Sequence, residues 1–449
     1  MTDRLDRPGV GVPWAPLLST AITLRVAVAF ALLGAMPMVS DARDYFDFAS
    51  RLATGHLGGP FYFPPGESLS LAAMFAAFGS TLLVARLLTI ATSVGTVVIT
   101  TLIARELADE RAARCAGWTA ALYPPSVMLC GQTYAQHLAA LCLGVIALFG
   151  LRAARDPRPH LFAWTGLAAG LGILTRPSMT SVVPVLAVAW GFALYRGSGG
   201  ARRAAGCGAA ISACVVLACV VPACTHNGLA GAGWTVSTNN ERNLFLGNNP
   251  YTPDYKTSHL GQRSLSELDP ATRGYLESFY ARPNARAAME HEAIGYMARH
   301  PERTALRTLN RATSFWGFDY LASREIQKWR GMGARAALPL LALEGGSFMA
   351  VAALALAALF ALRGAGDPEW RAWLVALALA YELPYTLAFS GGTYHFPVMP
   401  LIIPLASLAM AHPAETWRRA RQSRVTWAAL ATFALVQAEY AYFALVMVG

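Results

Sequence analysis

Residues 40–79, SDARDYFDFASRLATGHLGGPFYFPPGESLSLAAMFAAFG, form the first polar interruption in a chain of 449 residues that is otherwise dominated by long apolar runs. The stretch places three aspartates, Asp41 and Asp44 among them, and two arginines close to aromatic residues. It then reaches a Pro-Pro-Gly turn followed by Glu67 and a short apolar run. Ionisable residues at membrane depth are costly and tend to mark functional sites. Chemistry is therefore expected first in this stretch.

The composition excludes an ordinary soluble domain. Hydrophobic residues make up 55% of the chain and charged residues 14%, whereas soluble domains carry about 25% charged residues. The formal charge of +10 is carried mostly by arginine, and in a multi-pass membrane protein such a balance reflects basic cytoplasmic loops rather than nucleic-acid binding. The seven cysteines lie in or beside apolar runs without a CxxC pair, so neither a disulfide framework nor a metal site is expected from them.

About eleven apolar runs are predicted to cross the membrane. They are 15–38, 82–104, 112–129, 134–151, 161–175, 178–195, 205–225, 337–362, 371–390, 396–411 and 425–447. The run 67–79 is too short to cross a ~30 Å hydrocarbon core at ~1.5 Å per residue, so we expect an interfacial or re-entrant helix there. The predicted fold class is an all-α polytopic membrane protein.

Arginine is unevenly distributed over the loops between these runs. The loops predicted to be cytoplasmic carry 17 arginines, whereas the short loops on the other side carry only Arg43, Arg51 and Arg176. By the positive-inside rule, the N-terminus is cytoplasmic, and the C-terminus and the 40–79 stretch are extracytoplasmic. We expect the protein in the cell (inner) membrane.

The chain divides into three predicted parts. Residues 1–225 form an N-terminal transmembrane module with a first outer loop at 39–81, residues 226–336 form an extracytoplasmic segment, and residues 337–449 form C-terminal transmembrane helices. The segment begins with a region rich in Asn, Gly, Pro and Thr, which predicts a folded loop rather than a helix. Its later part, about 283–316, has the pattern of amphipathic helices lying on a membrane surface.

Two interpretations of the 40–79 stretch remain open on the residues alone. A carboxylate beside arginine at a membrane–water boundary can act as a general base on an acceptor hydroxyl or amine, and arginine can hold a phosphate through bidentate contacts. The blander interpretation is a solvated polar loop in which Asp41 caps the helix DYFDFASRLATG.

A series of motifs then resembles a known family. The first outer loop carries D-x-x-x-Y-x-x-x-A-x-x-L-x-x-G at Asp41, Tyr45, Ala49, Leu52 and Gly55, followed by PPG and FG. Four further segments follow in order: ARLLTIATSVGTVVITTLIARELADERAAR at 85–114, GLAAGLGILTRPS at 166–178, NNERNLFLGNNP at 239–250 and YHFPVMPLIIPLASLAM at 394–410. Together they resemble GT-C integral-membrane glycosyltransferases, most closely the bacterial protein O-mannosyltransferase and lipid A aminoarabinose transferase branch.

The resemblance implies a GT-C-like helix bundle and a hexosyl- or pentosyltransferase. Such an enzyme transfers a sugar from a polyprenyl-phosphate carrier to an extracytoplasmic acceptor. Asp41 matches the family's catalytic acid, with Asp44 as the second candidate. The base deprotonates the acceptor, which displaces the lipid phosphate with inversion, and the leaving phosphate then needs positive charge around it.

The other candidate residues fall into three groups. The expected contacts to the donor phosphate and lipid are Arg43, Arg86, Arg176, Tyr394 and His395. The expected substrate contacts are Glu67, Tyr134, Gln136, Asn240, Arg242, Asn248 and Asn249. The acids inside apolar runs, expected to line a cavity that opens outward, are Glu344, Glu382 and Glu439.

Each group has a structural alternative. Arg176 could extend to the membrane interface without a ligand, His395 could serve as a structural hydrogen-bonding group, and the asparagine cluster at 239–249 could build turns. The buried acids could each be hydrogen-bonded locally within the bundle.

The chain also departs from the family pattern. His395 stands where the family has an arginine after the tyrosine, and the turn CGQTYAQHL at 130–138 offers no second acid. No cofactor is firmly implied, and a divalent metal is not expected. The expected partners are membrane lipids, the lipid-linked sugar donor and an acceptor glycan, lipid or protein, without nucleic acid. A flippase of a lipid-linked envelope precursor and a non-catalytic GT-C scaffold are the alternatives, although the chain lacks the inverted-repeat halves common in transporters.

Overall fold

The computed structural model describes residues 11–256, 259–262 and 264–442, and these residues form helices and loops without a strand. The N-terminal part holds α1 (Trp14–Val26), η1 (Ala27–Leu32), α2 (Ser40–Ala53), α3 (Gly66–Phe78), α4 (Leu82–Leu107), α5 (Glu110–Leu122), α6 (Pro124–Met128), η2 (Leu129–Gly131), α7 (Gln136–Arg155), α8 (Pro159–Thr175), η3 (Pro177–Ser181), α9 (Val182–Arg196) and α10 (Gly199–Leu229).

The remaining helices follow in two groups. The first holds α11 (Asn240–Gly247), α12 (His259–Gln262), η4 (Leu265–Glu267), α13 (Pro270–Tyr280), α14 (Ala285–Arg299), α15 (Pro301–Phe315) and α16 (Leu321–Arg330). The second holds α17 (Ala334–Ala361), α18 (Pro368–Leu387), η5 (Gly392–Val398), α19 (Met399–Ala411), α20 (Pro413–Gln422) and α21 (Arg424–Tyr442).

Seven helical stretches of the described chain are long and apolar enough to cross a membrane. They are Trp14–Leu32, Leu82–Leu107, Gln136–Arg155, Pro177–Arg196, Gly199–Leu229, Ala334–Ala361 and Gly392–Ala411. This confirms the all-α polytopic fold class. The other four expected spans are helical as α5 with α6, α8, α18 and α21, but these helices are interrupted, short or less apolar. The count of eleven therefore stays a prediction, and the end of the last expected span lies outside the described residues.

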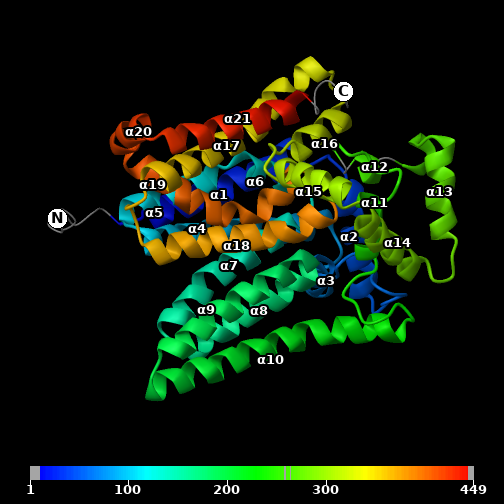
Figure 1. Cartoon of the computed structure of the whole chain (residues 1–449), viewed down its shortest axis with the longest axis horizontal. Coiled ribbons are helices and arrows are strands. Elements are labelled where there is room, and N and C mark those ends of the chain that lie inside the picture. Colours follow the sequence, from blue (N-terminus) through cyan, green and yellow to red (C-terminus); the bar gives the residue numbers. More distant parts are fainter. Residues whose placement is uncertain (1–10, 257–258, 263, 443–449) are drawn as a thin grey trace.

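The bundle has two distinct ends (Figure 1). The long helices run along its long axis, α5 and α20 lie at one end, and α2, α11, α13 and α14 gather at the other. Helices of the 40–79 stretch and of the 226–336 segment therefore lie at the same end of the bundle. This agrees with the prediction that both lie on one side of the membrane. The division into three parts stays a prediction.

Two features of the segment after α10 bear on the sequence predictions. The expected folded loop around 239–250 is wrong in part, because residues 240–247 form the helix α11. Helices are present at about 283–316, as α14 and α15, and their position on the membrane surface stays a prediction. The short run after the Pro-Pro-Gly turn is likewise a helix of 13 residues, α3, whose length of ~20 Å falls short of a bilayer core.

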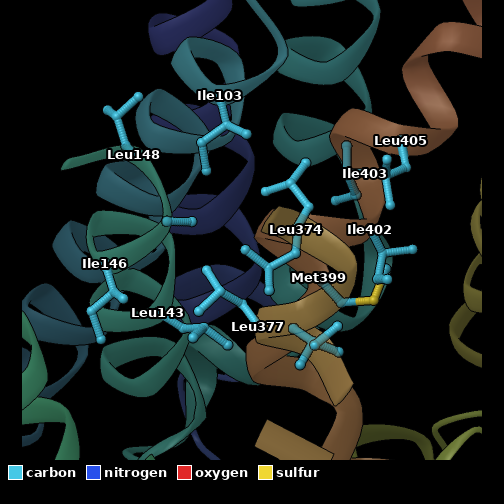
Figure 2. Packing of buried hydrophobic residues seen from close by; sticks show 14 of the residues in the cluster. Ile103, Leu143, Ile146, Leu148, Leu374, Leu377, Met399, Ile402, Ile403 and Leu405 are labelled. Atoms are coloured by element: carbon cyan, nitrogen blue, oxygen red, sulfur yellow. The ribbon is translucent and has the colours of Figure 1, made fainter. Parts of the chain in front are cut away.

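The core is built from apolar side chains of four central helices. Ile103 of α4, Leu143 of α7, Leu377 of α18 and Ile402 of α19 are buried in one cluster (Figure 2). Because lipid is as apolar as these side chains, van der Waals packing rather than the hydrophobic effect holds such helices together. At the α8–α10 contact, small residues allow this approach: a Cβ on Gly170 would lie 2.6 Å from the Cβ of Cys219.

Candidate functional site

A cleft of ≈ 560 Å³ opens at the end of the bundle where α2, α11 and the last turn of α18 meet. Its lining includes Asp41 and Tyr45 of α2, Arg176 at the end of α8, and Asn240 and Arg242 of α11. Five predicted site residues therefore line one cleft: Asp41, Arg176, Asn240, Arg242 and Tyr394. They include one carboxylate and two arginines.

Asp41 lies in the first turn of α2, where a negative charge is favoured by the helix dipole. The preceding Ser40 has a left-handed φ of 51°, an unusual conformation for a non-glycine residue. The Oγ1 of Thr133 donates to the Ala42 carbonyl at 3.0 Å and fixes this turn. The structure gives α2 no side-chain N-cap, so the interpretation of Asp41 as a capping residue is wrong.

The surroundings of Asp41 alter its proton affinity. Asp41 is exposed to the cleft, but the protein around it desolvates the carboxyl and raises its pKa. The positive charge of Arg176 opposes this rise, and the negative charge of Asp44 adds to it. Arg176 therefore limits the rise in the pKa of Asp41.

Arg176 follows the last residue of α8 and is surrounded by tyrosines. Its Cζ lies 5.7 Å from the ring centre of Tyr394, and its Nε is buried without a hydrogen-bond partner among the described residues. Leaving such a donor unpaired costs about 1–3 kcal/mol. An anion that enters the cleft can remove this cost, since a guanidinium binds phosphate or carboxylate oxygens readily.

The Pro-Pro-Gly-Glu turn supports Arg176 from behind. A Cβ on Gly66 would lie 2.7 Å from the backbone nitrogen of Thr175, so a glycine is required for α3 to pack against the end of α8. The next residue, Glu67, is buried behind the cleft wall, and burial raises its pKa to about 8 against the opposing charge of Arg176. Glu67 does not line the cleft.

Helix α11 brings Asn240 and Arg242 to the cleft. The Glu241 carboxylate forms an ion pair of 2.5 Å with Arg286 of α14, and this contact anchors α11 to its neighbour. The Arg242 guanidinium lies 5.7 Å from the ring centre of Tyr280. The two later asparagines of the cluster instead bind backbone: Asn248 donates to the Leu387 carbonyl at 2.9 Å, and Asn249 donates to the Phe245 carbonyl at 2.7 Å.

Several other candidates do not line the cleft. Asp44, the second catalytic candidate, is exposed on α2. Arg43, a predicted phosphate ligand, is exposed on the same helix with its Nε 4.0 Å from Asp47. Arg86 is buried and donates to backbone carbonyls, among them Met36 at 2.7 Å. Its role is to hold the chain after η1.

His395 and the start of α7 also lie away from the cleft. The Nδ1 of His395 lies 2.9 Å from the Phe315 carbonyl, and its ring stacks on Phe348 at 3.8 Å. These contacts fit the structural alternative for His395. Tyr134 and Gln136 are buried and are not among the residues that line the cleft.

The three acids in apolar runs each have a separate partner. Glu344 accepts from the Ala322 amide at 2.9 Å, Glu382 accepts from the Trp316 indole at 3.0 Å, and Glu439 pairs with Lys256 at 2.9 Å. None of them lines the cleft. Glu439 lines a separate cavity of ≈ 450 Å³ with Asp254 and Tyr255. The local partners of Glu344 and Glu382 fit the structural alternative of acids hydrogen-bonded within the bundle, and the cavity shared by all three acids stays a prediction.

Sequence reasoning missed the hydroxyl groups beside Arg176. Ser178 donates to the Tyr385 hydroxyl at 3.0 Å, and the Tyr381 and Tyr385 hydroxyls lie 3.1 Å apart. The four-residue spacing of the two tyrosines places them on one face of α18, and this spacing was the available signal. No group of three or more His, Cys, Asp or Glu suited to a metal occurs in the described part of the chain.

Known proteins share this architecture. Residues 63–226 match the protein family described as dolichyl-phosphate-mannose-protein mannosyltransferase. ArnT from Cupriavidus metallidurans, in a crystal structure with undecaprenyl phosphate, aligns with a TM-score of 0.54 and 15% identity over 90% of this chain and 62% of that chain. The chain has a GT-C fold. This confirms the resemblance seen in the sequence motifs at the level of the fold.

A second GT-C structure agrees. The oligosaccharyltransferase of Archaeoglobus fulgidus in its apo form aligns with a TM-score of 0.50 and 15% identity over 95% of this chain. The chain spans only 55% of that protein and 62% of ArnT. No curated protein matches the chain. The family match includes Arg176 but begins after Asp41.

Proposed function

We propose that this GT-C protein transfers a sugar, a hexose or a pentose, from a polyprenyl-phosphate-linked donor to an acceptor at the extracytoplasmic face of the inner membrane. One observation carries the proposal: Asp41 and Arg176 line the same cleft, and the Arg176 Nε is buried without a hydrogen-bond partner among the described residues. The fold that the chain shares with ArnT, whose structure holds undecaprenyl phosphate, supports a lipid phosphate as the anion.

In the proposed mechanism, Asp41 acts as the general base. Its carboxylate takes the proton of the acceptor hydroxyl or amine as the acceptor attacks the anomeric carbon. The bond between that carbon and the phosphate oxygen breaks, and the electron pair leaves with the polyprenyl phosphate. A single displacement of this kind inverts the anomeric centre.

Two arginines stabilise the leaving group in this mechanism. Arg176, which lines the cleft, donates to the phosphate oxygens, and Tyr394 holds its guanidinium through a cation–π contact. Arg242 approaches from the α11 wall, and Asn240 beside it offers an amide to the sugar hydroxyls. Electrostatic stabilisation of this kind is usually the largest single term in catalysis.

The cleft carries one carboxylate, Asp41, among its described lining residues. Divalent cations bound by proteins normally take several oxygen ligands from side chains. We therefore propose that arginine charge, rather than a metal, stabilises the leaving phosphate.

Replacing Asp41 tests this function. With purified protein in lipid, a lipid-linked sugar donor and an acceptor, we expect Asp41→Asn to lower the release of polyprenyl phosphate by about 10²- to 10⁴-fold, the usual contribution of a general base. Asp47→Asn is the matched control, because Asp47 lies on the same helix, is exposed and does not line the cleft. Unchanged transfer by Asp41→Asn rejects Asp41 as the base. Movement of intact donor lipid without release would favour a flippase.

A further inference from the structure

A second cavity, the apolar groove, lies between α1, η1, α6, α16 and α17 and has a volume of ≈ 720 Å³. Its walls are lined by Leu, Val, Ile, Met and Pro side chains, and Arg330 at the end of α16 is the one charged residue among its described lining. The groove shares no lining residue with the cleft that holds Asp41 and Arg176. Its volume lies within the ~300–1,000 Å³ typical of ligand sites.

The groove faces outward from the bundle. Leu32, Leu122 and Leu343 line it and are 61%, 51% and 53% exposed. Leu32 belongs to the π-helical turn η1, which interrupts the regular course of α1. Side chains of this kind at a lipid-facing surface accept hydrocarbon rather than water.

The mouth of the groove attracts negative charge. Arg330 forms no ion pair with a carboxylate within the described residues; its Nη2 lies 3.4 Å from the Leu32 carbonyl, and its Cζ lies 4.1 Å from the ring centre of Trp329. Met332, which also lines the groove, immediately precedes Gly333 and the start of α17. That helix has 28 residues and no side-chain cap at its N-terminus, so its free amides add positive potential at the same place.

We infer that the apolar groove binds one anionic phospholipid of the surrounding membrane, with an acyl chain along its walls and the phosphate at Arg330 and the start of α17. Apolar walls with a single uncompensated cation at the mouth match the two halves of such a lipid. Basic pockets between transmembrane helices on the cytoplasmic side of membranes bind anionic head groups through the same two kinds of contact. The donor is not the expected occupant, because the proposed function puts its phosphate at Arg176 in the separate cleft.

Lipid binding to the full-length protein tests this inference. With phosphatidylglycerol and phosphatidylcholine of equal chain length, we expect native mass spectrometry to show tighter binding of phosphatidylglycerol. Arg330→Gln should weaken that binding roughly fivefold, the factor for one arginine at an anionic lipid surface. Lys328→Gln removes the same charge from the same helix at a residue that does not line the groove, and it should keep the preference.

A second variant separates the walls from the mouth. Leu343→Trp should fill the groove at an exposed position and lower the binding of both lipids, while circular dichroism confirms that the helices remain. Equal binding of the two lipids by the unmodified protein overturns the inference, as does equal loss in Arg330→Gln and Lys328→Gln. Displacement of bound phosphatidylglycerol by polyprenyl phosphate, retained when Arg176 is replaced by Gln, would assign the groove to the donor instead.

Discussion

Asp41 and Arg176 influence each other through their charges. Desolvation raises the pKa of Asp41, and the positive charge of Arg176 opposes this rise. The Arg176 Nε is buried without a hydrogen-bond partner among the described residues, so the guanidinium can still bind an anion. Both residues were singled out by motifs in the sequence. His395 was singled out in the same way, but it binds the Phe315 carbonyl instead. The difference depends on long-range packing of η5 against α15, which no local pattern reveals.

The charge coupling predicts a shift in the pH profile. The proposed base must be ionised, so kcat/KM should rise with pH through the raised pKa of Asp41. Arg176→Gln removes the charge that lowers this pKa, and the rising limb should therefore move to higher pH. Arg176→Lys keeps the charge and should keep the limb near its original position, although activity falls with the loss of bidentate contacts. An unchanged limb in Arg176→Gln would show that the two groups are not coupled.

Glu67 predicts a pH dependence of stability. Its pKa is raised by burial to about 8, above the ~4.3 of an unfolded glutamate. The native state therefore holds a proton that the unfolded state releases, so stability is highest below the unfolded pKa and falls as pH rises toward 8. Thermal unfolding in detergent from pH 5 to 8 should show this fall in the unmodified protein and a smaller one in Glu67→Gln. Equal slopes would contradict it.

At the scale of the helices, long apolar runs predicted helices correctly, whereas polar stretches predicted helix ends and loops poorly. Leu82–Leu107 matches the expected 82–104 closely. The run 112–129 divides at Tyr123, because Pro124 and Pro125 start a new helix, α6. The asparagine-rich 239–250 stretch looked like a loop, yet α11 forms there, since packing against α14 outweighs the weak helix propensity of asparagine.

The contact between α8 and α10 should tolerate little extra volume. At Gly170, a Cβ would already lie 2.6 Å from Cys219, so Gly170→Leu should force the helices apart and destabilise the protein by about 1–3 kcal/mol or more. Gly191→Leu on α9 is the matched control, because a Cβ there meets nothing within 4 Å. Thermal unfolding of both variants is the measurement. Similar midpoints for the two variants would contradict close packing at Gly170.

The fold as a whole gathers α2, α11, α13 and α14 at one end of the bundle (Figure 1), and residues of α2 and α11 line the cleft. The arginine-rich α20 lies at the other end. Because successive membrane spans alternate in direction, the sequence predicts that the cleft residues share one end and that basic residues lie at the other. The sequence does not predict the apolar groove, because helices α1, α6, α16 and α17 meet only in the folded bundle.

The separation of the two ends predicts an orientation that labelling can measure. Because arginines favour the cytoplasmic side, α20 should face the cytoplasm and α13 the cell exterior. In a background with the native cysteines replaced by serine, Ser266→Cys should react with a membrane-impermeant maleimide in intact spheroplasts. Gln422→Cys, at the end of α20, should react only after the membrane is permeabilised. Both positions are exposed in the structure, so reaction at Gln422→Cys alone in intact spheroplasts would invert the topology. It would also place the cleft on the cytoplasmic side, where an extracytoplasmic acceptor could not reach Asp41.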